Sequence, residues 1–229
     1  MSFDFALRAT EILLALAFLQ QSAEHVFGGG PARRLFALRL LLAMALLSGV
    51  QSAWNIALLS LHSLAVLHRF QGPYNGGSDR MGLLILYSIC FAHWLPAGLL
   101  SEVAFGYLAV QVLLSYFISG RVKIVNADWR SGQALADVFA FSAYPVSEGL
   151  RSLAARKQAL FVASWAVMLF EVLFPLALMD QALLIGALGV ASVVYLANAC
   201  LFGLNRFLWF WIAAYPSILW LQARMVQGA

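Results

Sequence analysis

Long runs of apolar residues make up most of the chain, and short polar or glycine-rich breaks separate them. A membrane-spanning helix needs about 20 mainly apolar residues, and several of these runs reach that length. The stretch Leu35–Phe70 is too long for one crossing, so we divide it near Ser48–Ser52. The pattern predicts an all-α integral membrane protein with about eight transmembrane helices, at residues 5–27, 35–50, 53–69, 81–99, 102–119, 158–179, 181–203 and 205–222.

One long stretch, residues 120–157, lies outside these runs and carries six basic and three acidic residues. We expect it to form a long interfacial loop, because charged side chains are costly inside the bilayer. Within it, Ser131–Phe139 has the length and composition of a short helix lying at the membrane surface. The chain as a whole, residues 1–229, is then expected to be a single polytopic membrane domain.

Composition agrees with a membrane location and excludes an ordinary soluble enzyme. Hydrophobic residues make up 63% of the chain and charged residues only 10%, against about 25% charged in a soluble domain. The net charge of +4 comes from basic residues scattered between apolar runs, without a basic face. We therefore expect no nucleic-acid partner and attribute these residues to orientation in the bilayer.

Only a few residues are candidates for chemistry. Glu171 lies in the middle of an apolar run, where an ionisable group is a site hypothesis by default, with a structural hydrogen bond as the equal alternative. His93 could act as a base or bind a ligand, although an interfacial histidine beside Trp94 is the simpler interpretation. Lys123 is either an interfacial anchor or, if partly desolvated, a base. Asn198 fits packing between helices better than catalysis. No metal-ligand spacing is present, so we expect no metal site.

Two spaced motifs give the chain a family resemblance. The first consists of Tyr116–Gly120, Lys123, Ala127-Asp128-Trp129 and Gly132. The second consists of Asn198, Leu201-Phe202, Phe207 and Pro216, with an acid on the preceding helix, Glu171. Together they resemble the membrane domain of vitamin K-dependent gamma-carboxylase, within the wider HTTM family of horizontally transferred transmembrane domains. The resemblance covers roughly residues 80–222 and, more weakly, the first helix.

The resemblance implies a quinone or lipid as ligand or cofactor, with Asp128, Trp129 and Asn198 as candidate binding residues. It also implies catalytic roles for Lys123, His93 and Glu171. This sequence departs from the carboxylase, however, because Ile124 stands where the carboxylase has its proposed base, a second lysine. We also expect no counterpart of the carboxylase's large lumenal domain.

Two hypotheses follow from the resemblance and its departures. The first, which we favour, is a non-carboxylating HTTM protein that binds a lipid, a quinone-like molecule or a partner membrane subunit. The second is a membrane enzyme that uses a reduced isoprenoid quinone and resembles gamma-carboxylase. We expect either protein to lie in a bacterial inner (cytoplasmic) membrane. The enzyme hypothesis predicts one cavity that contains Lys123, Glu171 and Asn198 together.

Overall fold

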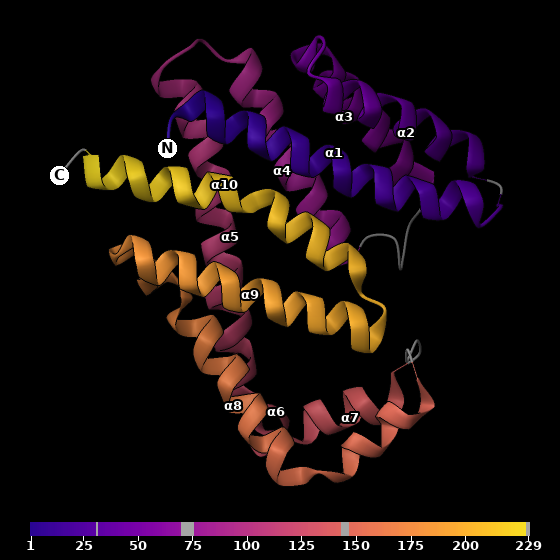
Figure 1. Cartoon of the computed structure of the whole chain (residues 1–229), viewed down its shortest axis with the longest axis vertical. Coiled ribbons are helices and arrows are strands. Elements are labelled where there is room, and N and C mark those ends of the chain that lie inside the picture. The colour runs from indigo at the N-terminus through magenta and orange to yellow at the C-terminus, as the bar shows by residue number, and fades with distance from the viewer. Residues whose placement is uncertain (31, 70–75, 143–146, 228–229) are drawn as a thin grey trace. The chain divides into compact units, whose positions relative to one another are not determined.

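The computed structural model describes residues 1–30, 32–69, 76–142 and 147–227, and these ranges are helical with no strand (Figure 1). The helices in chain order are α1 (Phe3–Phe27), α2 (Arg33–Ser48), α3 (Ser52–Arg69), α4 (Gly77–Trp94), α5 (Leu99–Val125), α6 (Ala127–Ser131), α7 (Gln133–Phe141), η2 (Glu148–Ala155), α8 (Lys157–Leu173), η3 (Phe174–Met179), α9 (Gln181–Phe202) and α10 (Asn205–Gln227). The all-α prediction is confirmed.

The prediction of eight membrane-spanning helices is not supported. Among the described residues, three helical stretches are long and apolar enough to cross a membrane: Leu99–Val125, Lys157–Met179 and Gln181–Phe202. The other long helices fall short for physical reasons that differ from one to the next. Helix α2 has only 16 residues, α1 contains Glu11, Gln20, Gln21 and Glu24, and α10 contains Pro216 and several amphipathic aromatic residues.

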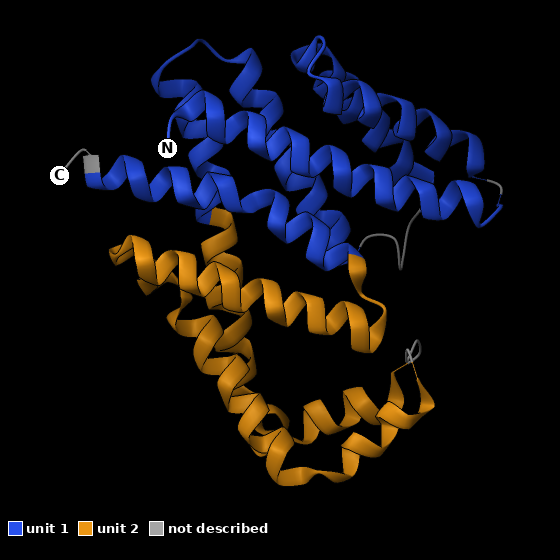
Figure 2. Cartoon of the chain, viewed as in Figure 1, with its two compact units in different colours: residues 1–110, 206–229 blue, residues 111–205 orange. Residues whose placement is uncertain are grey.

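The chain divides into two compact units, residues 1–110 with 206–229 and residues 111–205 (Figure 2). We call them unit 1 and unit 2. In unit 1, α2 packs against α1 and α3, and α4 packs against α1 and α3. Helix α10 runs antiparallel to α1, since Phe210 contacts Phe18 while Trp220 contacts Phe3. The core of this unit is apolar and fully buried, as at Leu14, Ile56 and Ile85.

Unit 2 contains the second half of α5 and the elements from α6 to α9. Helices α8 and α9 keep many large apolar side chains exposed, among them Val162, Leu183 and Val193. An exposed apolar surface of this extent is unfavourable in water and favourable in lipid. Unit 2 therefore has the surface of a membrane protein as well as the composition of one.

The predicted loop 120–157 differs from the structure, which continues α5 to Val125 and places α6, α7 and η2 in much of the remainder. Residues 143–146 of this stretch lie outside the described residues. Gly120 does not end the helix. It lies inside α5, where the absence of a side chain allows close packing against α8. The short helix expected at Ser131–Phe139 is observed two residues later, as α7.

The sixth predicted membrane helix, at 158–179, changes character at its end. Helix α8 stops at Leu173 and continues as the 3-10 helix η3. Pro175 explains the change, because proline has no N–H to donate and its ring clashes with the preceding turn of an α-helix.

Candidate functional site

An ion pair within unit 2 joins α5 to α8. The Nζ atom of Lys123 donates to Oε1 of Glu171 at 2.5 Å and to Oε2 at 2.6 Å. It also donates to the Oγ atom of Ser119, one helical turn earlier on α5, at 3.1 Å. An ammonium group has three donors, so these contacts engage all three. Both side chains of the pair are largely withdrawn from solvent, with 18% and 16% exposed.

Gly120 is what allows α5 and α8 to approach closely enough for this pair. A Cβ atom at Gly120 would lie 2.7 Å from the backbone nitrogen of Val172 and 2.9 Å from Cβ of Glu171. Such distances are far inside van der Waals contact, so only glycine fits here. The glycine lies one turn before Lys123 and touches the residue that carries the carboxylate, and it thereby sets the register of the pair.

Trp129 is brought to the same place by the short helix α6. The Asn126 side chain caps α6 by accepting from the backbone nitrogen of Asp128. Helix α6 is held against α8, because Ser164 donates to the carbonyl of Trp129 at 2.6 Å. The Trp129 ring then lies 5.2 Å from Nζ of Lys123, a cation–π distance.

Gly132 makes the sharp turn between α6 and α7 possible. Its φ of +81° lies in the left-handed region that glycine tolerates. A Cβ atom there would also lie 2.9 Å from the backbone of Phe161 on α8. Both requirements select glycine, and both keep α6 and α7 against α8.

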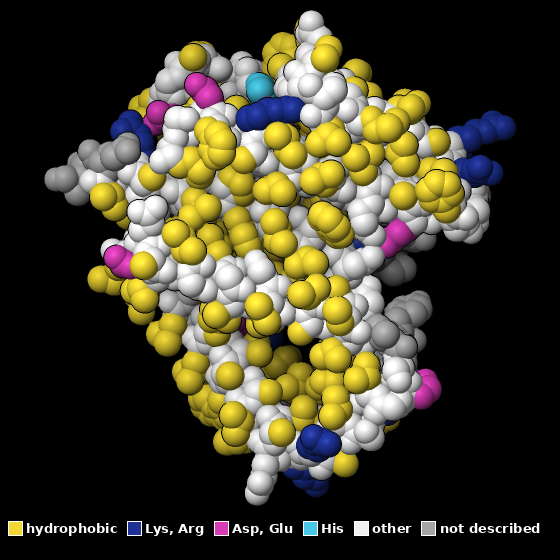
Figure 3. All heavy atoms as spheres, in the orientation of Figure 1, with side chains coloured by type: hydrophobic (Ala, Val, Ile, Leu, Met, Phe, Trp, Pro, Cys, Tyr) yellow, Lys and Arg dark blue, Asp and Glu magenta, His cyan; other side chains and the backbone are white. Residues whose placement is uncertain are grey.

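The ion pair opens into a cavity of about 280 Å³. Figure 3 shows a hollow with hydrophobic side chains on its rim in the part of unit 2 that is in view. Side chains from α5, α6, α7, α8 and α9 line the cavity: Tyr116, Lys123, Trp129, Leu135, Ala166, Val167, Phe170, Glu171, Val190, Ala191, Val194, Tyr195 and Asn198. A mainly apolar pocket with a few convergent polar groups is typical of a small-molecule site.

The cavity brings together four of the six residues proposed from the sequence. Lys123, Trp129, Glu171 and Asn198 all line it. Asp128 is exposed at the start of α6 and is not among the lining residues. The three side chains that the enzyme hypothesis requires in one cavity therefore do share one, although the geometry assigns no catalytic role to any of them.

His93 belongs to unit 1, where it has its own acidic partner. Its Nε2 atom lies 2.5 Å from Oε1 of Glu11 on α1. Glu11 is 2% exposed and also accepts from Arg8 at 2.7 Å. Arg8 in turn donates to the carbonyls of Leu46 and Leu47, at the end of α2. His93 is thus part of a network that joins α1, α2 and α4.

Tyr116 and Ser119 fall within the first sequence motif, but neither is predicted from the sequence as a site residue. Tyr116 and Ser119 lie on the Lys123 face of α5, at spacings of seven and four residues, and this helical periodicity was a usable signal. Tyr116 stacks on Phe174 with ring centroids 3.9 Å apart, which fixes one wall of the cavity. Tyr195 is also not predicted as a site residue, and its place in the cavity depends on how α9 packs.

Comparison with known proteins identifies the family. The model of the HTTM domain matches residues 100–222, which is more than half of the chain. The chain therefore belongs to the HTTM domain family, and it is an integral membrane protein of that family. The matched segment includes the whole of unit 2 and its cavity. Searches of curated proteins and of solved structures found no match to the chain.

Proposed function

We propose that the chain binds a lipid or quinone-like molecule in the cavity of unit 2, with the polar head of the ligand at Lys123 and Glu171. The observation that carries this proposal is a charged pair set into an otherwise apolar cavity of about 280 Å³. A ligand with a polar head and an apolar body matches that division, and an entirely polar ligand does not.

An adjoining groove supports a ligand with a tail. This groove has a volume of about 550 Å³ and shares Trp129, Leu135 and Asn198 with the cavity. Its further walls include Val138 and Phe141 of α7 and Phe202 of α9. An acyl or isoprenoid tail leaving the cavity would find apolar contacts along this groove. The bacterial inner membrane is the location that we propose, since it contains both lipids and isoprenoid quinones.

Binding without turnover fits the state of Lys123 better than catalysis. A general base needs a free lone pair within reach of the proton that it removes. The Nζ atom of Lys123 donates to Ser119 and Glu171 and lies over Trp129, so the chain itself already engages this group. A binding role requires no proton to leave the lysine, and the Glu171 carboxylate can accept a further hydrogen bond from a polar head group.

The alternative function is a membrane enzyme that uses a reduced isoprenoid quinone, as in gamma-carboxylase. The observation that favours the enzyme is that one cavity is lined by Lys123, Glu171 and Asn198. Incubating the purified protein with a reduced short-chain menaquinone, with oxidation followed by absorbance, distinguishes the two functions. We expect no turnover. Turnover that Lys123→Ala abolishes would establish the enzyme and end the binding-only proposal.

Blocking the cavity tests ligand binding directly. The protein is purified in mild detergent, and the molecules that accompany it are extracted and measured by mass spectrometry. Val194 lines the cavity, whereas its neighbour Val193 points away and is 66% exposed. We expect Val194→Trp to remove an equimolar lipid or quinone that Val193→Trp retains. Equal amounts of every accompanying molecule in the two variants would refute the proposal.

The partner-subunit version of the hypothesis has a separate readout. If the exposed apolar faces of α8 and α9 bind another membrane protein, Val193→Trp should remove that protein after gentle extraction while Val194→Trp retains it. We propose lipid as the occupant of these faces, so neither variant is expected to change the proteins that co-purify.

A further inference from the structure

Unit 1 contains a second polar site, centred on a buried arginine, that is independent of the proposed function. Arg39 of α2 is only 6% exposed. Its Nε atom donates to the Oγ atom of Ser22 on α1 at 3.0 Å. The centre of its guanidinium group lies 4.5 Å from the ring centroid of Phe36 and 5.1 Å from that of Phe18. These contacts hold the group in place from two helices.

The guanidinium group is incompletely satisfied. Its Nη2 atom is buried and has no hydrogen-bond partner among the described residues. The two aromatic rings stabilise the positive charge, but they accept none of its N–H bonds in the ordinary way. A buried donor without a partner costs about 1–3 kcal/mol, and more when the group is charged. An arginine that was only structural would be expected to find an acceptor on the chain.

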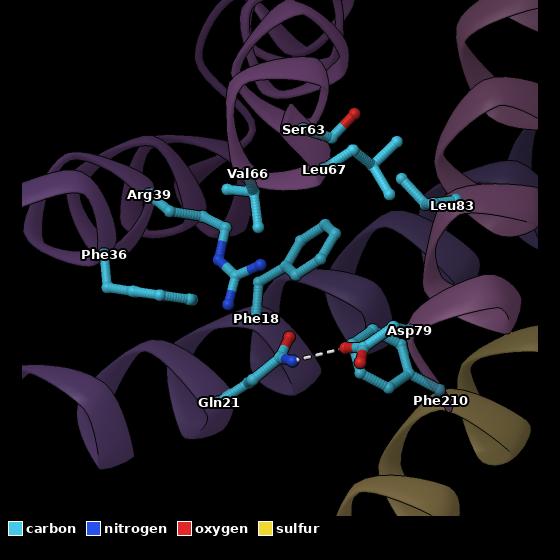
Figure 4. A pocket seen from close by; sticks show the side chains of 10 residues that line it. All are labelled: Phe18, Gln21, Phe36, Arg39, Ser63, Val66, Leu67, Asp79, Leu83 and Phe210. Atoms are coloured by element: carbon cyan, nitrogen blue, oxygen red, sulfur yellow. Dashed lines mark hydrogen bonds between the residues drawn. The ribbon is translucent and has the colours of Figure 1, made fainter. Parts of the chain in front are cut away.

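Arg39 faces a small cavity, which Figure 4 shows from close by with its lining side chains. The cavity has a volume of about 40 Å³. A single water occupies about 10–15 Å³ of such a cavity, so this one has room for roughly three polar heavy atoms. Apolar side chains, including Val66, Leu67, Leu83 and Phe210, make up much of the wall.

Besides Arg39, the polar residues of the wall are Ser63, Gln21 and Asp79. Gln21 donates from Nε2 to Oδ1 of Asp79 at 2.7 Å, as the dashed line in Figure 4 marks. No direct ion pair joins Asp79 to Arg39 among the described residues, so the carboxylate offsets the arginine charge only from a distance. Arg206 is engaged separately by Glu24, at 2.8 Å. Neither Asp79 nor Arg206 therefore engages the guanidinium group of Arg39, and its Nη2 atom keeps free donors toward the cavity.

We propose that this cavity binds the carboxyl group of an apolar acid, such as a fatty acid, through the Nη2 face of Arg39. A carboxylate has three heavy atoms, which matches the volume, and its oxygens are the natural partners of a guanidinium group. Because the carboxyl group fills this volume, the chain that carries it must leave the cavity past its apolar wall. A free phosphate has five heavy atoms, which is too many for the volume, and it has no apolar chain to contact the apolar wall.

Native mass spectrometry in a neutral maltoside detergent tests the proposal, with dodecanoate, dodecanol and acetate as probes. Dodecanoate should bind. Dodecanol, which lacks the carboxylate, and acetate, which lacks the apolar chain, should each bind at least about tenfold more weakly. Arg39→Gln should weaken dodecanoate at least about tenfold by removing the charge-assisted hydrogen bond. Arg34→Gln is the matched control, because Arg34 lies on the same helix and is exposed. It should bind dodecanoate like the wild type.

Two further variants keep the test decisive if Arg39→Gln fails to fold. Leu83→Trp fills the cavity while leaving Arg39 in place, and it should also abolish dodecanoate binding. Asp79→Asn removes the negative charge that faces the arginine, and it should tighten binding. Dodecanol or acetate binding as well as dodecanoate would overturn the proposal, and so would dodecanoate binding that is unchanged in Arg39→Gln or Leu83→Trp.

Discussion

The Nζ atom of Lys123 lies 2.5 Å from Oε1 of Glu171, although 48 residues separate them in the chain. The pair joins α5 to α8 at the wall of the unit 2 cavity. Each charge is withdrawn from water and depends on the other for its stability. The pair is therefore both a structural link and the most polar point available to a ligand in this cavity.

Removing one member of the Lys123–Glu171 pair should destabilise the protein more than removing both. Lys123→Met leaves the Glu171 carboxylate partly buried without its counter-charge, at a cost on the order of 3 kcal/mol. The double variant Lys123→Met/Glu171→Leu should recover most of this loss, because no unpaired charge is left. A double-mutant cycle on unfolding in mixed detergent–SDS micelles measures the coupling. Additive losses would mean that the two side chains do not depend on each other.

Gly120→Ala should destabilise unit 2 by roughly 1–3 kcal/mol, the usual cost of forcing an extra carbon into packed structure. The new Cβ would push against the backbone of Val172, and no flexible side chain can move away to relieve the contact. We also expect weaker ligand binding, because the push separates Lys123 from Glu171.

Gly186→Ala is the matched control for this substitution. Gly186 lies within α9 of the same unit, and a Cβ there would meet no atom within 4 Å. Alanine favours the helix over glycine, so Gly186→Ala should be neutral or stabilising in the same unfolding assay. The packing argument fails if the two variants lose equal stability.

His93→Gln should lower the stability of the protein without weakening ligand binding in the unit 2 cavity. The substitution breaks the contact with Glu11, which joins α4 to α1. Glu11 keeps its bond from Arg8, so the loss should be smaller than that from Glu11→Gln, which weakens both contacts. Unfolding and ligand-extraction measurements on the same samples separate the two effects. Loss of the co-purified ligand at unchanged stability would instead make His93 part of the binding site.

The contacts that Arg151 of η2 makes with Glu148 and with α7 should weaken under acid conditions. Arg151 donates to Glu148 at 2.6 Å and to the carbonyl of Ala140 on α7 at 2.6 Å. The hydrogen bond and charge of Arg151 lower the pKa of Glu148 from its usual value. The ion pair therefore contributes stability above the usual glutamate pKa and loses it as the pH falls through the lowered value.

Hydrogen exchange of residues 133–142 and 147–155 measures this effect. In the wild type, protection factors should fall modestly as the pH is lowered from 7 to below the pKa of Glu148. The factors are corrected for the intrinsic pH dependence of exchange. Glu148→Gln should show reduced protection already at pH 7 and little further change. A fall of equal size in this variant would assign the pH effect to another group. Because Glu148 is exposed, added salt should also reduce the effect.

The positions of most helices could be predicted from the sequence, because helix formation depends on local composition. Apolar runs, glycines and prolines predict starts and ends within two residues of those of α1, α2, α3 and α9, and they predict the start of α10 but end it five residues too early. The exceptions arise where tertiary packing changes the role of a residue. The pattern predicts a helix end at Gly120, whereas close contact with α8 uses this glycine inside the last turns of α5. The pattern predicts eight membrane spans, whereas three helical stretches of the described ranges are long and apolar enough to cross a membrane.

The sequence alone predicts a helical membrane protein with an HTTM-like motif, and it indicates six candidate residues: His93, Lys123, Asp128, Trp129, Glu171 and Asn198. The packing of the helices is needed to see that four of them, without His93 and Asp128, line one cavity, and that His93 pairs with Glu11, 82 residues away. The physical reason is that helix formation follows from neighbours along the chain, whereas the partner of a buried charge is set by which helices pack together. That packing also reveals Arg39, one scattered basic residue in the sequence, as a buried cation with an unpartnered donor among the described residues.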